Sequence, residues 1–127
     1  KAGIAPEQID YINAHATSTM LGDKTEIQSI KNAFGDHTKK LKVNATKSMI
    51  GHTGWTAHSV ELIASIMQMK NSCLHPSINI DEPDPEIEGI DVCANKKVEN
   101  YEINHFLNNS FGFGGLNCCS VIKKWQE

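Results

Sequence analysis

Residues 41–52 read LKVNATKSMIGH, and this stretch decides how the chain is expected to fold. Leu41 to Ala45 are predicted to form a β-strand. A polar segment follows at once, in which Lys47 and His52 are five residues apart and Gly51 directly precedes the histidine. Glycine lets the backbone turn sharply because it has no Cβ atom. The stretch therefore predicts a strand that ends in a loop carrying two ionisable side chains.

Further segments of the chain extend this pattern into an α/β domain. Asp23 can cap a helix that Gly35 ends, and a second helix is predicted from about Trp55 to Lys70. Strands are predicted at residues 9–14, 41–45, 90–93, 105–109 and 116–124. This order favours one α/β domain over residues 1–127, with a mixed β-sheet covered by helices.

The second predicted helix is apolar around most of its circumference. Its polar side chains form a narrow stripe, consisting of His58, Glu61, Ser65 and Gln68. A stripe of this kind is ordinarily a solvent-exposed face. A helix that is otherwise so apolar is typical of an interior layer of a protein.

The bulk composition excludes several classes of function. The chain has 127 residues and a formal net charge of -3, with 12 basic and 15 acidic residues well mixed. Because no basic stripe exists, neither nucleic acid nor an anionic membrane is expected as a partner. No apolar run has the length of a membrane span. The four cysteines lack a C-x-x-C spacing, so we expect reduced thiols in a cytoplasmic protein.

Three polar loops are the candidates for a functional site. They are residues 15–19 (HATST), 46–52 (TKSMIGH) and 109–115 (NSFGFGG). The first two follow the carboxyl ends of predicted strands, which is where α/β sheets usually bind their ligands.

Taken together, NAHATST, KSMIGH and NSFGFGG resemble the carboxyl-terminal half of β-ketoacyl synthases, closest to elongating condensing enzymes of the synthase II type. The resemblance extends to GDKTE at 22–26, VE at 60–61, PSIN at 76–79 and PDP at 83–85. It implies half of a thiolase fold, and it implies decarboxylative Claisen condensation in fatty-acid or polyketide synthesis.

The resemblance assigns roles to several side chains. His15 and His52 would each donate an Nε2–H to the thioester oxygen on which charge develops. Lys47 would be buried and would fix the loop, with Glu26 or Glu61 as its partner. Phe113, with Gly112 and Gly114 beside it, would supply a backbone N–H and gate the acyl tunnel. Thr17 and Thr19 would position a phosphopantetheine arm, while Asp23, Glu26 and Glu61 would support the site.

The resemblance also implies partners. Acyl carrier protein would deliver the substrates on phosphopantetheine, so that no free cofactor or metal is expected. The nucleophilic cysteine would come from the protein's own amino-terminal half, in a homodimer or heterodimer. The chain by itself is then expected to be inactive, and to self-associate through its apolar helix.

Two rival functions remain open. One is a non-catalytic partner subunit resembling a chain-length factor, and the other is a binding module for a small ligand or metal built on the six histidines.

The chain also departs from the family's pattern. Ala16 stands where glycine is usual, and Trp55 and His58 replace small residues. If position 16 requires positive φ, alanine costs about 1 kcal/mol there. Our hypothesis is that Trp55 and His58 reshape the acyl pocket or the contact with the other half.

Overall fold

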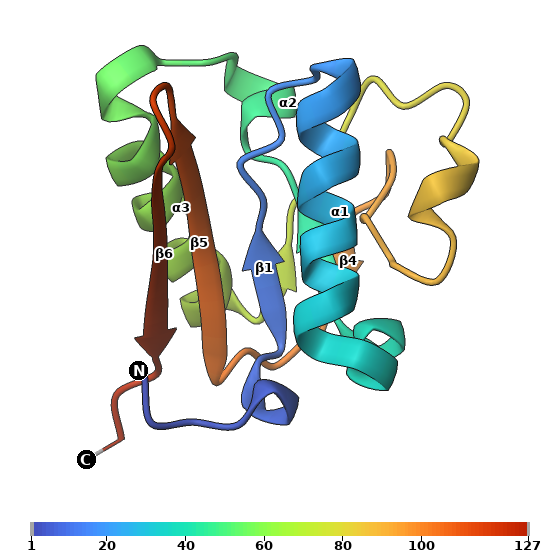
Figure 1. Ribbon diagram of the computed structural model, residues 1–127. Helices are drawn as coiled ribbons and strands as arrows, with labels where there is room; N and C mark the ends of the chain where they lie inside the picture. Colours follow the sequence, from blue (N-terminus) through green and yellow to red (C-terminus); the bar gives the residue numbers. More distant parts are fainter. Residues whose placement is uncertain (1, 127) are drawn as a thin grey trace.

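A four-stranded mixed sheet forms the centre of the computed structural model, which describes residues 2–126 (Figure 1). Lys1 and Glu127, which are the predicted bounds of the domain, lie outside the described residues. The strand order is β2-β1-β5-β6. β1 is parallel to β2 and to β5, whereas β5 and β6 form an antiparallel hairpin. These strands are β1 (Tyr11–Asn13), β2 (Lys42–Asn44), β5 (His105–Gly112) and β6 (Leu116–Lys123). The predicted mixed sheet is therefore confirmed.

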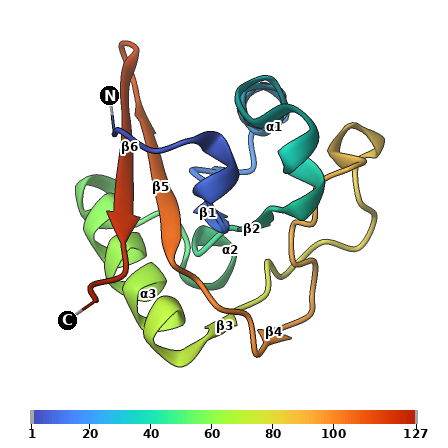
Figure 2. The ribbon, with the colours of Figure 1, turned by 90° about the horizontal axis from the view of Figure 1, so that it is seen from below.

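The two long helices lie on opposite faces of this sheet (Figure 2). α1 (Met20–Phe34) connects β1 to β2, and α3 (Ala57–Asn71) follows β2. Successive strand residues point to opposite faces, so β1 contributes to two cores. Ile12 packs on the α1 side with Ile30 and Val43, and Tyr11 packs on the α3 side with Phe106.

The α3 helix packs with its polar stripe inward, contrary to the usual solvent-exposed orientation of such a stripe. Glu61, Ser65 and Gln68 are buried against the sheet. Tyr11 lies within hydrogen-bond distance of Ser65, and Gln68 donates a hydrogen bond to the Tyr11 hydroxyl. Apolar side chains of the same helix face outward, namely Val60, Ile63, Ile66 and Met67. The sheet thus supplies polar partners for Ser65 and Gln68, whereas Glu61 pairs with Lys47 of α2.

Shorter elements connect these parts. They are η1 (Pro6–Gln8), η2 (Gly35–Lys40), α2 (Lys47–Ile50), η3 (Gly54–Thr56), β3 (Cys73–Leu74), η4 (Pro85–Ile87) and β4 (Val98–Glu99). The β3–β4 pair was not predicted. The predicted strand at 90–93 is wrong, because only Asp91 bridges to Lys42 and Cys93 adopts a φ of 51° that ends the extended conformation.

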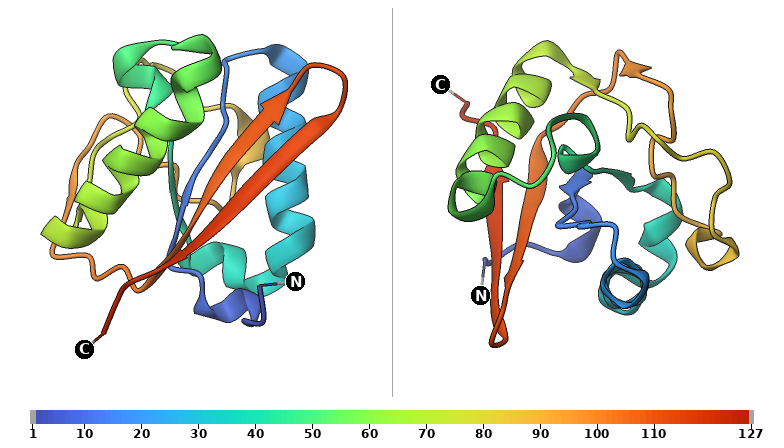
Figure 3. Two further views of the ribbon diagram at one scale, coloured as in Figure 1. Left: turned by 90° about the vertical axis from the view of Figure 1, so that its left-hand side faces the viewer. Right: turned by 90° about the horizontal axis from the view of Figure 1, so that it is seen from above.

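Two other boundaries differ from the sequence prediction. The N-cap residue of α1 is Thr19, and Asp23 lies inside the helix, where its carboxylate accepts a hydrogen bond from the Ser18 amide. The β5–β6 connection is shorter than predicted, because β5 continues to Gly112 and leaves residues 113–115 as the turn. Figure 3 shows this turn at the same end of the molecule as the start of α1, with both chain ends at the opposite end.

Candidate active site

Three of the predicted site residues, His15, Lys47 and His52, gather at one edge of the sheet. His15 follows β1, Lys47 and His52 follow β2, and Phe111 lies near the end of β5. Since β1, β2 and β5 are parallel, their carboxyl ends meet at this edge. A groove of about 710 Å³ runs along it, and its lining includes Lys47, His52, Thr17 and Thr19. The fold thus brings together loops that are more than thirty residues apart in sequence.

Glu26 of α1 holds the loop that carries His15. Its buried carboxylate accepts hydrogen bonds from the backbone amides of His15 and Ala16, each at 2.9 Å. Asn109 of β5 donates a third hydrogen bond to the same carboxylate at 3.0 Å. Hydrogen bonds to a charged acceptor are among the stronger ones in proteins. The carboxylate therefore connects α1, β5 and the histidine loop.

Ala16 has a φ of 36°, so the position does require positive φ. A residue that has a Cβ atom is strained in this backbone conformation, whereas glycine adopts the conformation readily. We expect Ala16→Gly to raise the free energy of unfolding by about 1 kcal/mol in urea titrations. The control is Ala33→Gly, on the exposed part of α1, which should lower the same free energy by about 1 kcal/mol. A loss of stability from both substitutions would contradict the strain at Ala16.

Lys47 forms a buried ion pair with Glu61 of α3. The Lys47 Nζ to Glu61 Oε1 distance is 2.5 Å, and the two side chains are only 4% and 1% exposed. Burial raises the pKa of the Glu61 carboxyl, and the nearby Lys47 ammonium opposes this shift. Of the two predicted partners, Glu61 is the one that contacts Lys47, since Glu26 is occupied by the histidine loop.

The same lysine determines the tautomer of His15. Lys47 Nζ lies 3.4 Å from His15 Nδ1, and an ammonium group can only donate. His15 Nδ1 is then the acceptor, and Nε2 carries the hydrogen in the neutral ring. Burial, followed by the charges of Lys47 and His52, lowers the pKa of His15 to about 4. His15 is therefore neutral at pH 7.

His52 has the matching arrangement. The backbone N–H of Gly54 donates to His52 Nδ1 at 3.0 Å, which leaves the hydrogen of the neutral ring on Nε2. The centroids of the His15 and His52 rings are 6.0 Å apart, and the ring planes are nearly perpendicular. The structure thus places two imidazoles side by side, each with a hydrogen-bond donor at Nε2.

The remaining predicted residues are the two threonines of the first loop and Phe113 with its neighbouring glycines. The Thr17 and Thr19 hydroxyls are 3.5 Å apart on the groove wall. Phe113 is fully exposed in the hairpin turn, and Gly114 beside it has a φ of 82°. The structure therefore does not bring the Phe113 ring to the histidines.

Phe111 and Asn109 are neighbours of the site that the sequence interpretation did not assign to it. The centroid of the Phe111 ring lies 5.4 Å from that of the His15 ring. Asn109 binds Glu26 as described above. Their place in the NSFGFGG loop was visible in the sequence, but the direction of their side chains was not.

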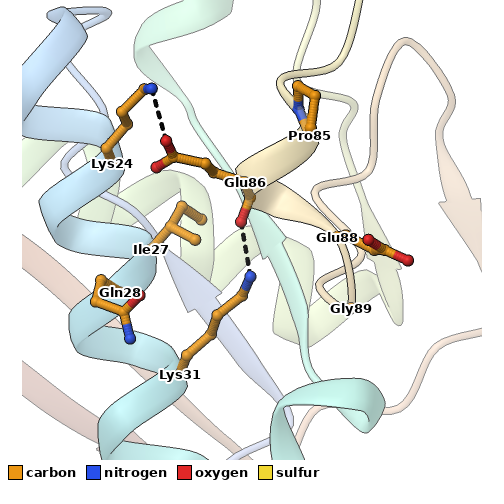
Figure 4. Close-up of a pocket in the computed structure, with 8 residues that line it drawn as sticks. All are labelled: Lys24, Ile27, Gln28, Lys31, Pro85, Glu86, Glu88 and Gly89. Carbon is orange, nitrogen blue, oxygen red and sulfur yellow. Dashed lines mark hydrogen bonds and ion pairs between the residues drawn. The ribbon is translucent and has the colours of Figure 1, made fainter.

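A second, smaller hollow of about 380 Å³ lies between α1 and residues 85–89 (Figure 4). Lys24 binds the Glu86 carboxylate at 2.8 Å, and Lys31 donates to the Glu86 backbone oxygen at 2.6 Å. Both amines are already engaged, and none of the predicted catalytic residues lines this hollow. We therefore place the candidate active site at the larger groove, whose lining includes Lys47 and His52 but not His15.

Two features are absent from residues 2–126. No three His, Cys, Asp or Glu side chains in this range are grouped to hold a metal ion. No helix in it has both the length and the apolar character needed to cross a membrane.

Known proteins resemble this chain in sequence and in structure. Residues 1–81 match the family described as "Beta-ketoacyl synthase, C-terminal domain". The chain is 47% identical to the chloroplastic 3-oxoacyl-[acyl-carrier-protein] synthase I of Hordeum vulgare, over 98% of the chain and 26% of that protein. It is 42% identical to 3-oxoacyl-[acyl-carrier-protein] synthase 2 of Staphylococcus aureus, over 98% of the chain and 30% of that protein.

Solved structures extend the likeness. A ketosynthase in complex with its type II polyketide acyl-carrier protein superposes with a TM-score of 0.89 at 32% identity, covering 94% of this chain and 29% of that one. The ishigamide ketosynthase/chain length factor has a TM-score of 0.90 at 34% identity, covering 98% of this chain and 30% of that one. In all four proteins, this chain corresponds to about a quarter to a third of the length.

Proposed function

The chain belongs to the β-ketoacyl synthase family, and we propose that it supplies the decarboxylation machinery of a condensing enzyme. The likeness to ketosynthase structures confirms the predicted fold class, the carboxyl-terminal half of a thiolase-like fold. The observation that carries the proposal is the adjacent imidazole pair. His15 and His52 each have an acceptor role imposed on Nδ1, which leaves a donor at Nε2.

Two neutral donors suit the decarboxylation of a malonyl thioester. The bond between the α-carbon and the carboxylate breaks, CO₂ leaves, and the electron pair forms an enolate with negative charge on the thioester oxygen. Preorganised donors stabilise that charge as it develops. The enolate carbon then attacks the carbonyl carbon of an enzyme-bound acyl thioester, and the cysteine thiolate is the leaving group.

Lys47 serves this pair without transferring a proton in our proposal. Its ammonium is held by Glu61 and points a hydrogen at His15 Nδ1. It thereby keeps His15 in the neutral Nε2–H form that the oxygen of the substrate needs. Glu26 has the companion role, because its carboxylate holds the backbone of the same loop.

The acyl group is carried by a cysteine outside these 127 residues in the proposed mechanism. None of the residues that line the groove is a cysteine. Cys93 is buried in the core beside α3, and burial raises the pKa of its thiol to about 12, which disfavours the thiolate. The nucleophile would come from the amino-terminal half of the whole protein.

The substrates would arrive on the phosphopantetheine of an acyl carrier protein. One of the similar structures contains an acyl-carrier protein by its title. Thr17 and Thr19, on the wall of the groove, are proposed to bind the arm through their hydroxyls. Phe113, between Gly112 and Gly114 at the hairpin turn, is proposed to gate the acyl tunnel.

The assembly and location of the whole protein stay predictions. A homodimer or a heterodimer is proposed, and one similar structure is a ketosynthase/chain length factor by its title. The cytoplasm was predicted from the sequence, whereas the barley relative is chloroplastic by its name.

The test is made on the whole protein that carries this domain. We expect His15→Ala and His52→Ala each to lower the rate of CO₂ release from malonyl-carrier protein by about 10²–10³-fold, the usual effect of removing one oxyanion donor. Transfer of an acyl group from its carrier to the enzyme should persist. His105→Gln, at the start of β5, is the matched control and should leave both rates unchanged.

Two outcomes would contradict the proposal. If both histidine variants released CO₂ at the full rate, the imidazole pair would not be the decarboxylation machinery. If the unmodified protein neither accepted an acyl group nor released CO₂, the non-catalytic partner subunit resembling a chain-length factor would be the better assignment.

A further inference from the structure

His58 connects three elements of the fold through one side chain. It is the second residue of α3, in the segment where this chain departs from the small residues of the family's pattern. Its Nε2 lies 3.1 Å from the Ser120 hydroxyl on β6, and its Nδ1 lies 3.2 Å from Asn108 Nδ2 on β5. Asn108 Nδ2 also donates to the His58 backbone oxygen at 3.1 Å.

These contacts define one consistent set of donors and acceptors. Asn108 Nδ2 can only donate, so His58 Nδ1 accepts and the neutral ring donates from Nε2 to Ser120. Asn108 and Ser120 are directly opposite each other in the hairpin. The imidazole therefore hydrogen-bonds Asn108 on β5 and Ser120 on β6, which face each other across the two strands.

The connection continues from Asn108 to the loop of Lys47. Asn13 Nδ2 donates to Asn108 Oδ1 at 2.8 Å, and Asn13 Oδ1 accepts from the Thr46 hydroxyl at 2.7 Å. Asn13, Asn108 and Thr46 are all buried. Because Thr46 directly precedes Lys47, hydrogen bonds run without a gap from β6 to the residue before Lys47.

The β6 strand of the hairpin has few attachments beyond its ladder with β5, whereas β5 also pairs with β1 and binds Glu26 through Asn109. Among residues 2–126, Ser120 is the one β6 side chain that hydrogen-bonds a different element. Ile122, farther from the turn, packs against the core beside α3. Toward the turn, Leu116 and Phe113 are exposed. Among the described residues, the His58–Ser120 contact is thus the side-chain hydrogen bond from β6 to another element that lies nearest the glycine-rich turn.

We infer that His58 is a positioning residue that anchors the β5–β6 hairpin to the start of α3 and so limits how readily the turn at residues 113–115 opens. Its consequence for catalysis rests on the proposed function, in which Phe113 gates the acyl tunnel. The anchoring itself does not, because it depends only on the contacts of His58. This role also accounts for a residue that the proposed mechanism leaves without a function.

Hydrogen exchange of backbone amides, measured by mass spectrometry on the whole protein, tests the inference. His58→Ala should speed exchange in peptides covering residues 112–119 by about tenfold. This factor corresponds to about 1.4 kcal/mol, the loss of one or two hydrogen bonds. Peptides of α1 and β1 should exchange as before. His58→Gln, which can still accept from Asn108 and donate to Ser120, should restore most of the protection.

Ser59→Ala is the matched control, since Ser59 is the exposed neighbour of His58 on the same helix. Exchange in residues 112–119 that is equal in His58→Ala and Ser59→Ala would overturn the inference. If His58→Ala does not fold, Ser120→Ala carries the test, with the same direction and a smaller increase of about threefold for one hydrogen bond. No increase in Ser120→Ala would also overturn it.

The outcome is separate from that of the proposed function. Faster exchange in His58→Ala supports the anchor even if the unmodified protein releases no CO₂ from malonyl-carrier protein. Conversely, an active protein whose hairpin exchange does not respond to His58 has the proposed chemistry without this anchor.

Discussion

Replacing Lys47 by methionine is expected to lower the free energy of unfolding by about 3–5 kcal/mol, a large part of the 5–15 kcal/mol that stabilises a typical domain. The reason is the partner that remains. Glu61 is 1% exposed, and its Oε2 has no hydrogen-bond partner among the described residues. Without the Lys47 ammonium, the carboxylate must stay buried and uncompensated or take up a proton. The measurement is urea unfolding of the whole protein, followed by circular dichroism.

The double variant Lys47→Met with Glu61→Leu separates the ion pair from simple packing. Removing both charges removes the unpaired group, so most of the lost stability should return. Lys24→Met is the control for losing a lysine, because Lys24 pairs with Glu86 on the surface and should matter little. A double variant that is as unstable as Lys47→Met alone would show that the cost does not come from the unpaired carboxylate.

The second large effect is expected for the outward face of α3. Four apolar side chains on this face are 37–63% exposed, namely Val60, Ile63, Ile66 and Met67. Fully burying an apolar side chain of this size contributes about 1.5–3 kcal/mol, and covering the exposed part of each of these side chains contributes roughly half of that. We therefore expect the isolated 127-residue chain to self-associate through α3 in sedimentation velocity experiments.

Charged substitutions on this face should reverse the association. Ile63→Glu combined with Met67→Glu is expected to shift the isolated chain toward monomer, because buried carboxylates oppose the contact. Ala33→Glu, on the exposed part of α1, adds a charge on the other side of the sheet and should leave association unchanged. A stable monomer of the unmodified chain at high concentration would contradict the prediction.

Local sequence patterns were sufficient for most of the elements. The runs at residues 9–14, 41–45, 105–109 and 116–124 each overlap a strand of the sheet, and both long helices lie within four residues of their predicted bounds. These features depend on short-range periodicity and on glycine, which neighbouring residues decide. The strand predicted at 90–93 is the exception, because it depended on pairing across the sheet. The pairing extends no further than Asp91.

The sequence by itself determined which loops carry ionisable groups, and that His15, Lys47 and His52 come after strands. Only the tertiary structure decided which atoms these groups face. In the structure the polar stripe of α3 faces inward, and the Phe113 ring is exposed. Lys47 pairs with Glu61, whereas Glu26 accepts hydrogen bonds from the backbone of the His15 loop. The physical reason is that a buried polar atom must find a partner wherever the packed elements offer one, and such partners lie up to 95 residues away in the chain.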